Sequence, residues 1–404
     1  MPYELRTADP RTDENLEALL DGSFRRPNRE SRLVRMLGEG LPTFDPGLSL
    51  VATREARDVA FALFLPREFY VRGAKVPLVI SSPVCALPEV RGKGAARFLL
   101  DAGLAALDDR GIAGAMVLGG SEFFARLGYR GAFNLYTIDA QRTHLDGFEA
   151  EGALEWGGLA AEDIPHLAEL YDRCYRGVSG SEVRSHAPLD WESSSDSAYT
   201  VVHRHADRPV AYLRFRLRER LEIMECAAAD PSAVRAVIGF VRRIALEHNR
   251  PGADVHVPPS HPVFRELFRA GCMAEGNNFH DEGRLLITNW QRFFAATGSS
   301  FARALNTVGV PAVSLGIETR SGREEWCLTA QGKAELEVSA GRADVHIELP
   351  EGWAEPLMTG RLDWRDLEFA KALPKDLNRQ LSSLLFPPGT PMWTYSPAFE
   401  VAYG

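Results

Sequence analysis

Long hydrophobic runs are missing from this sequence. No stretch approaches the roughly 18 apolar residues that a membrane-spanning helix needs, so we expect no membrane partner. The opening residues, MPYELRTADPRTDEN, also lack the basic and apolar regions of a secretory signal peptide. These two absences predict a cytoplasmic protein.

Cysteine is scarce as well. The chain has five cysteines, an odd number, and no two of them form a C-x-x-C pair. This pattern is typical of free thiols in a reducing compartment and argues against a structural zinc site. We therefore expect no bound metal.

Positive charge is also in short supply. Lysine and arginine together number 46 against 55 aspartates and glutamates, which gives a formal net charge of −9. This balance disfavours nucleic acid as a partner, because phosphate backbones are held by clustered cations. It is compatible with a cationic substrate, although an acidic surface mostly confers solubility.

What the chain does have is the composition of a globular protein. Of its 404 residues, 45 % are hydrophobic and 25 % are charged, and the length suggests two or three domains. In the first part, an apolar run over residues 76–86 is interrupted at Pro83, where we expect a break or bulge because proline cannot donate to a strand ladder. The pattern then predicts a helix over 95–109 and strands over 113–118 and 134–139.

The second part repeats this order of elements. We predict a helix over 162–175, strands over 199–203, 210–216 and 221–227, a helix from residue 231 to about 248, and strands over 254–257 and 285–288. The turn before its long helix, AADPS at 228–232, contains no glycine. We interpret this part as a second copy of the fold that has lost its anion-binding loop.

The last part predicts a small α+β unit. Expected strands at 313–317, 325–329, 334–338 and 344–348 are followed by expected helices at 353–359, 364–369 and 376–385. The proline-rich segment 386–393 cannot be helical and leads into an aromatic tail. We expect this segment to dock on the protein, because exposed aromatic side chains are costly in water.

The most informative segment is the turn RGKGAA at residues 91–96, between a strand and a helix. A helix N-terminus carries unpaired N–H groups and the positive end of the helix dipole, and glycines let an anion approach that backbone. The segment is neither a GxxxxGK[ST] loop nor a GxGxxG motif. A tight strand–helix turn with a solvated basic edge is the alternative interpretation.

Two motifs in this first part resemble the GCN5-related N-acetyltransferase superfamily. Arg91, Gly94 and Ala96 meet its coenzyme A pyrophosphate pattern, Arg/Gln-x-x-Gly-x-Gly/Ala, after a strand. About 30 residues later, FFARLGY at 123–129 resembles the superfamily's Tyr-x-x-x-Gly-Phe/Tyr segment. The two motifs occur in the order that the superfamily requires.

The order of the three parts resembles the enhanced-intracellular-survival family of that superfamily. This implies an α/β (α+β) fold with two tandem acetyltransferase-type mixed-sheet units, the second degenerate, followed by a sterol-carrier-like α+β unit. The corresponding divisions are an acetyl-CoA-binding N-acetyltransferase domain at 1–145, a degenerate second domain at 146–288, and a sterol-carrier-like C-terminal domain with a docked tail at 289–404. Homo-oligomers occur in the family, so we expect an oligomer.

The resemblance also implies a reaction, in which an amine attacks the thioester of acetyl-CoA, the co-substrate, and takes its acetyl group. The acceptor would be a small molecule, and aminoglycoside-like polyamines are among the amines that the family suggests. In the superfamily the strand before the loop is splayed, so that free backbone amides hold the cofactor and polarise the thioester carbonyl. On this chain those amides would belong to Val84, Cys85 and Ala86. The amides that would hold the pyrophosphate are those of Arg91, Gly92, Lys93, Gly94, Ala95 and Ala96.

Two positions depart from the family patterns. The superfamily's general acid is often the tyrosine that begins the second motif, where this chain has Phe124, which has no proton to give. In the survival family a C-terminal carboxylate assists deprotonation of the amine, and here it would belong to Gly404. A second interpretation therefore stays open: a non-catalytic CoA- or lipid-binding protein that has lost its general acid. An acyl-cysteine at Cys85 is a further alternative to simple packing of that thiol.

Overall fold

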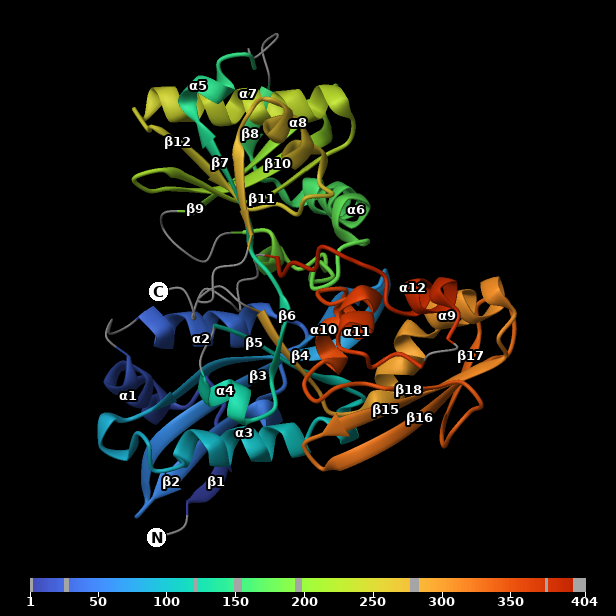
Figure 1. The fold of residues 1–404 in the computed structure, drawn as a ribbon. Coiled ribbons are helices and arrows are strands. Elements are labelled where there is room, and N and C mark those ends of the chain that lie inside the picture. Colours follow the sequence, from blue (N-terminus) through green and yellow to red (C-terminus); the bar gives the residue numbers. More distant parts are fainter. Residues whose placement is uncertain are drawn as a thin grey trace.

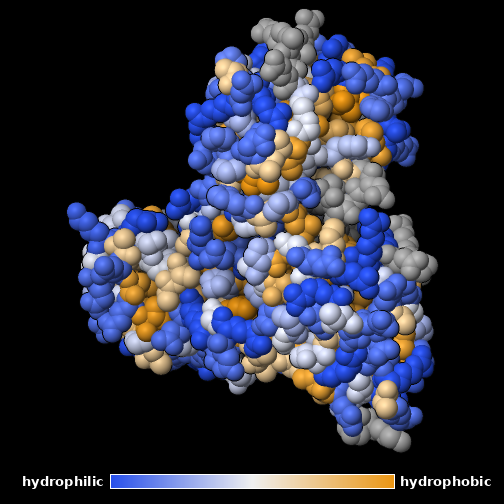
Figure 2. Space-filling model, turned by 180° about the vertical axis from the view of Figure 1, so that it is seen from behind, coloured by the Kyte–Doolittle hydropathy of each residue, from blue (hydrophilic) through white to orange (hydrophobic). Residues whose placement is uncertain are grey.

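Three β-sheets with helices packed against them make up this protein, as Figure 1 shows for the computed structural model. The structure describes residues 3–24, 29–119, 122–148, 155–192, 198–276, 283–374 and 377–394. Each sheet combines parallel and antiparallel pairs, which confirms the predicted α/β (α+β) class. No helix in these ranges is both long enough and apolar enough to span a bilayer. Most of the face in Figure 2 is hydrophilic, with apolar residues in small groups.

The first unit lies at the lower left of Figure 1. Its elements are β1 (Glu4–Thr7), α1 (Glu14–Ser23), α2 (Arg29–Gly40), β2 (Ser49–Arg54), β3 (Arg57–Val71), β4 (Ala74–Ala86), α3 (Ala95–Ala105), β5 (Gly114–Leu118), α4 (Glu122–Arg126) and β6 (Arg130–Phe133). Helix α3 ends four residues before the predicted end at residue 109. The chain continues as a short 3₁₀ turn, Asp108–Arg110, which stops at Gly111 with a φ of +71°.

The second unit lies at the top of Figure 1. Its elements are β7 (Tyr136–Gln141), α5 (Arg142–Leu145), β8 (Glu155–Gly158), α6 (Ile164–Tyr175), β9 (Ala198–His205), β10 (Arg208–Leu217), β11 (Leu221–Ala228), α7 (Pro231–Glu247), β12 (Gly252–Val255), α8 (Pro262–Arg269) and β13 (Met273–Gly276). The order from α6 to β12 follows the prediction.

The third unit lies at the lower right. Its elements are α9 (Trp290–Val308), β15 (Ala312–Thr319), β16 (Gly322–Ala330), β17 (Leu336–Ala340), β18 (His346–Glu348), α10 (Ala354–Thr359), α11 (Trp364–Phe369) and α12 (Arg379–Leu385). These strands form a four-stranded sheet in the order β17-β16-β15-β18. The predicted α+β character of this part is confirmed.

The two large sheets exchange one strand each. The first sheet has the order β1-β2-β3-β4-β5-β14-β6, so β14 (Gly283–Ile287), from the end of the second part, lies between β5 and β6. The second sheet has the order β13-β7-β12-β11-β10-β9-β8, so β7 lies between β12 and β13. The expectation that residues 134–139 form the last strand of the first unit is therefore wrong. The side-chain pattern of a strand shows which faces it buries but not which sheet it joins.

The proline-rich segment after α12 docks between the first two units, as predicted for its described part. The Met392 amide donates to the Ser179 carbonyl at 2.8 Å, and the Asn134 amide donates to the Pro391 carbonyl at 3.0 Å. Met392 and Trp393 are buried. The segment thus contacts both units through backbone hydrogen bonds and covers its own apolar side chains.

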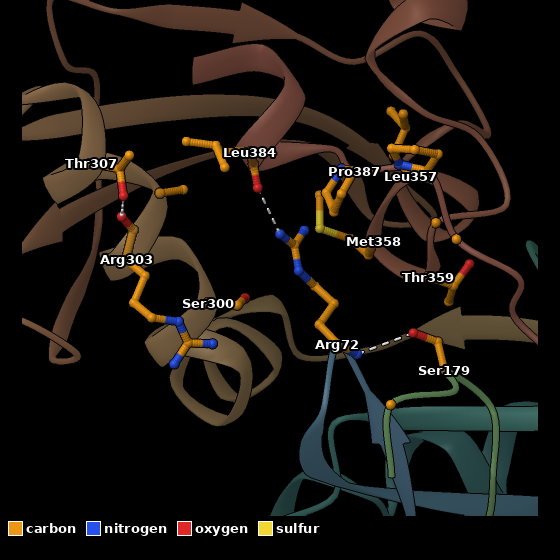
Figure 3. A pocket seen from close by; sticks show the side chains of 15 residues that line it. Arg72, Ser179, Ser300, Arg303, Thr307, Leu357, Met358, Thr359, Leu384 and Pro387 are labelled. Carbon is orange, nitrogen blue, oxygen red and sulfur yellow. Dashed lines mark hydrogen bonds between the residues drawn. The ribbon is translucent and has the colours of Figure 1, made fainter. Parts of the chain in front are cut away.

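A single arginine, Arg72, joins all three units at the tip of the β3–β4 hairpin (Figure 3). Its guanidinium donates to the Leu385 carbonyl at 2.6 Å, at the C-terminal end of α12, and lies 4.4 Å from the ring centre of Phe301. Its amide donates to the Ser179 hydroxyl at 3.1 Å. Burial, together with nearby Arg303, lowers the pKa of Arg72 to about 10. A cavity of about 310 Å³ remains beside it.

A buried ion network crosses from the first unit to the second. Arg67 on β3 donates to Glu182 and, at 2.5 Å, to Asp190. All three side chains are almost fully buried. Burial alone would raise the pKa of the Asp190 carboxyl, but Arg67 and Arg184 hold it below its usual value. Asp190 therefore favours its ionised form, and the buried charges of this network depend on their partners.

Glu355 on α10 makes stability depend on pH. It is buried, the Ile287 amide donates to it at 3.5 Å, and burial raises its pKa from 4.5 to about 7. Between these two values the unfolded chain loses the proton while the folded chain keeps it, so stability falls as pH rises from about 4.5 to 7.

Glu355→Gln is expected to remove this loss, worth up to about 3 kcal/mol, and to raise the melting temperature at pH 8 but not at pH 4. Glu351→Gln is the matched control, because Glu351 is nearby and largely exposed. Thermal unfolding of both variants between pH 4 and 8 measures the effect. Equal curves for the two variants would contradict it.

Candidate active site

The strand that precedes the glycine-rich turn separates from its parallel neighbour. β4 and β5 pair only as far as Ile80 and Met116, although β4 continues to Ala86 and β5 to Leu118. On its other side β4 stays paired with β3 up to Ala86. The second half of β4 therefore has an open edge toward β5, with backbone groups that face away from β3. This is the splayed strand that the resemblance implies.

A β-bulge bends β4 where this opening begins. The register between β3 and β4 shifts between Ala62 and Phe64, so that Ser82 and Pro83 lie opposite the single residue Leu63. This confirms the irregularity expected at Pro83. A bulge bends and twists the strand that carries it, and here it redirects the segment that leads into the turn.

The turn itself lies exposed between β4 and α3. Gly92 and Gly94 have φ values of +74° and +91°, which L side chains rarely adopt, and a Cβ at either position would meet nothing within 4 Å. Arg91, Lys93 and both glycines are exposed. The backbone of the turn is therefore accessible to a ligand, as an anion site requires.

The amides of the turn fall into two sets. Those of Arg91 and Lys93 donate to carbonyls of the preceding 3₁₀ turn, Pro88–Val90, at 3.4 and 3.1 Å, and so hold the loop together. The other four have no protein acceptor in the described part of the chain: Gly92, Gly94, Ala95 and Ala96. These four lie at the N-terminus of α3, where the helix dipole favours negative charge.

Side chains on both sides fix the position of the loop. The Arg91 guanidinium donates to the Ala86 carbonyl at 3.1 Å and to the Ser23 carbonyl at 2.6 Å, so it ties the loop to β4 and to the end of α1. The Tyr3 hydroxyl donates to the Lys93 carbonyl at 3.1 Å. Helix α3 lies so close to β3 that a Cβ at Gly103 would come within 2.1 Å of the Phe64 ring. The loop is therefore held by β4, by α1 and by the residue before β1, and the helix behind it packs closely on β3.

Cys85 is a packing residue in this arrangement. It is buried between Val84 and Ala86, which are half-buried, and burial raises the pKa of its thiol to about 11. A thiol with such a pKa stays protonated at neutral pH and is a poor nucleophile. The geometry thus favours packing over an acyl-cysteine at this position.

The second motif supplies aromatic side chains but no free acid. Phe124 on α4 is half-buried and lies edge-on to Tyr129, with ring centres 5.6 Å apart. The Tyr129 hydroxyl reaches to 3.4 Å from the Ser81 hydroxyl, on β4 next to the last paired residue, Ile80. Burial raises the pKa of Tyr129 to about 12, so this phenol is a core residue and not a ready proton donor. Gly404 lies outside the described residues.

A group of potential metal ligands lies in the third unit. Glu325, His346 and Glu348 bring ligand atoms within 4.8 Å of one another. Arg323 donates to both carboxylates, and the His346 ring lies 2.7 Å from Glu348. These carboxylates therefore already share a cation, and the group is explained as a surface ion-pair network. Sequence reasoning missed it because β16 and β18 lie on either side of β15 only in the folded sheet.

Comparisons with known proteins identify the first unit. Residues 4–132 match the family model described as acetyltransferase (GNAT) domain. The match spans the open strand, the exposed turn and the second motif, and it confirms the resemblance to this superfamily for that part of the chain. No curated protein sequence matches the chain.

Solved structures share the whole fold at low identity. A GCN5-related N-acetyltransferase from Anabaena variabilis is 16 % identical with a TM-score of 0.74, covering 98 % of this chain and 100 % of that one. One from Kribbella flavida is 17 % identical with a TM-score of 0.73, covering 97 % and 98 %. Eis1 from Mycobacterium abscessus is 15 % identical with a TM-score of 0.64, covering 98 % and 99 %. Since the coverage is nearly complete, the arrangement of three units is common to these proteins.

Proposed function

We propose that this chain, whose first unit matches an acetyltransferase (GNAT) domain, transfers an acetyl group from acetyl-CoA to a small-molecule amine. The observation that carries the proposal is the exposed turn with four free amides at the N-terminus of α3, next to the open edge of β4. In this proposal the four amides bind the diphosphate of CoA. The amides of Val84, Cys85 and Ala86 lie on the strand that would hold the pantetheine arm and polarise the thioester carbonyl.

The proposed reaction needs few catalytic side chains. The amine attacks the carbonyl carbon of the thioester, the C–S bond breaks, and the CoA thiolate takes a proton. An alkylamine of pKa about 10.4 must first lose its own proton, to a base or to water. The CoA thiol has a pKa of about 8.5, so its thiolate is a better leaving group than an alkoxide. A missing general acid therefore slows the reaction without preventing it.

A thiol-release assay with acetyl-CoA tests this proposal. The panel of acceptors includes polyamines and aminoglycosides, because a net charge of −9 is compatible with cationic substrates. Release of free CoA that depends on an amine supports the transferase. CoA binding without release for any amine would favour the other candidate, a non-catalytic CoA-binding protein, which Phe124 at the usual acid position supports.

Phe124→Tyr is expected to increase the turnover number, by up to about 10²-fold, because it adds a phenol where the superfamily often has its acid. The KM for acetyl-CoA should not change, since the turn is untouched. Phe123→Tyr on the same helix is the control for an added hydroxyl. An unchanged turnover number in the Phe124 variant would show that this position is not the proton donor here.

Gly404 is the proposed source of a carboxylate that helps to deprotonate the amine. Removal of residues 401–404 leaves the docked segment around Met392 in place. The expected result is a turnover number at least about 10-fold lower with unchanged CoA affinity, measured by the thiol-release assay and by calorimetry. Full activity of the shortened chain would remove Gly404 from the mechanism.

The proposal extends to the other two units. The second unit would be a degenerate acetyltransferase unit, since its elements repeat the order of the first, and the third would be sterol-carrier-like. The functional protein would be a cytoplasmic homo-oligomer. Size-exclusion chromatography with light scattering measures the oligomeric state.

A further inference from the structure

The second unit repeats the opening between strands that characterises the first. β11 and β12 pair in parallel only over three residues, ending at Ile223 and Val255, although β11 continues to Ala228. β4 and β5 likewise pair over three residues before β4 continues, still paired with β3 but no longer with β5. In each unit, the strand end that has separated from its parallel neighbour leads through a turn into a long helix, α3 or α7. The end of β11 therefore has the same place in its sheet as the end of β4.

The turn after β11 cannot hold an anion in the same way. Asp230 caps α7, and its carboxylate accepts from the Ala233 amide at 2.9 Å. Pro231 at the start of the helix has no N–H to offer. A negative charge of the chain itself already lies at this helix N-terminus. Any anion bound here must be recognised by side chains.

A basic cleft of about 680 Å³ opens at this place, between α6, α7 and α8. Its apolar wall includes Ala228, Ala229 and Val234, and its two acids are both engaged. Asp230 caps α7, and Glu266 is ion-paired with an arginine of its own helix. Four arginines line the cleft: Arg173, Arg235, Arg265 and Arg269.

Arg173 donates to the Ala229 carbonyl at 3.3 Å and Arg269 pairs with Glu266, whereas the side chains of the other two arginines have no hydrogen-bond or ion-pair partner in the described part of the chain. Arg235 lies in the first turns of α7 and Arg265 lies on α8, so they reach the cleft from two helices, and both are exposed. A guanidinium binds phosphate through two parallel hydrogen bonds. A pair of them matches a ligand with at least two negative charges. The cleft volume is within the range of small-ligand sites, roughly 300–1,000 Å³.

We propose that the second unit has a ligand site of its own, in which Arg235 and Arg265 bind a phosphorylated small molecule of nucleotide size. The site is separate from the turn at Gly94 and does not depend on acetyl transfer there. The loss of the glycine-rich loop in this unit therefore changed how phosphate is recognised, from backbone amides to guanidinium groups.

Calorimetric titration of the full chain tests this site. Gly94→Glu serves as the background, since a carboxylate in the first turn excludes phosphate from that unit. The probes are adenosine 3′,5′-bisphosphate, as a nucleotide, and inorganic pyrophosphate, as a bare anion. We expect one remaining site per chain, and we expect Arg235→Glu/Arg265→Glu to weaken binding at least 10-fold and Arg265→Glu alone to weaken it by less.

Arg208→Glu is the matched control for Arg265→Glu. Arg208 is an exposed arginine of the same unit, at the start of β10, and it does not line the cleft. The same charge change there should leave the affinity for both probes unaltered. If neither probe binds the Gly94→Glu chain, or if the Arg265 and Arg208 variants bind equally, the proposal is wrong. Tighter binding of the bisphosphate than of pyrophosphate would identify a nucleotide-like ligand, and equal binding a phosphate group alone.

Discussion

Gly94→Glu is expected to weaken the binding of CoA and acetyl-CoA to the first unit at least about 100-fold. The new carboxylate would extend into open space in front of four free amides, where the diphosphate of the cofactor should lie. Like charges brought together in a binding site cost several kcal/mol, and each 1.4 kcal/mol is a factor of ten in affinity. Calorimetry or the shift in melting temperature on adding CoA measures the loss.

Gly111→Glu separates this effect from backbone strain. Gly111 also has a positive φ, +71°, and a Cβ there also meets nothing within 4 Å. Both substitutions place an L residue in the left-handed region, at a cost of about 1–2 kcal/mol each, and both add one negative charge. Only the Gly94 variant should lose the cofactor. If both variants bind CoA like the unchanged chain, the assignment of the turn is wrong.

Arg67→Met is expected to lower the free energy of unfolding by about 3–5 kcal/mol. The substitution removes the guanidinium between two buried carboxylates, Glu182 and Asp190, and leaves their charges without that partner. Because Arg67 belongs to the first unit and both acids to the second, the loss should affect the two units together. Urea unfolding, followed by tryptophan fluorescence and by circular dichroism, measures its size.

Arg57→Met is the control on the same strand. Arg57 makes an ion pair with Glu89 at 3.0 Å, and more than half of its side chain is exposed. An exposed pair of this kind contributes about 0–1 kcal/mol. A loss at Arg67 no larger than the loss at Arg57 would show that the buried network does not hold the units together.

Local features of the chain were well predicted from the sequence. The apolar run at 76–86, the bulge at Pro83 and the helix after Gly94 follow from patterns and turn chemistry that act over a few residues. The same reasons explain the third unit, where each predicted strand overlaps a strand of the sheet. Short-range rules of this kind need no knowledge of the partner strand.

Long-range pairing could not be predicted in the same way. The strand at Tyr136–Gln141 has an ordinary alternating pattern that does not reveal its place in the second sheet. The ion network of Arg67 brings together residues far apart in the chain, and so does the cleft that Arg235 and Arg265 line. For the candidate site, the sequence indicated the turn but could not tell that the amides of Arg91 and Lys93 are used inside it.

The exchange of β7 and β14 has a consequence for synthesis of the protein on the ribosome. The first sheet contains a strand that ends at Ile287, so it stays unfinished, with β5 and β6 lacking their shared neighbour, until that residue has left the exit tunnel. A fragment cut after residue 145 would lack β14 between β5 and β6, and its β7 would have no partner strand. Completion of the first sheet is thus delayed until most of the polypeptide has emerged.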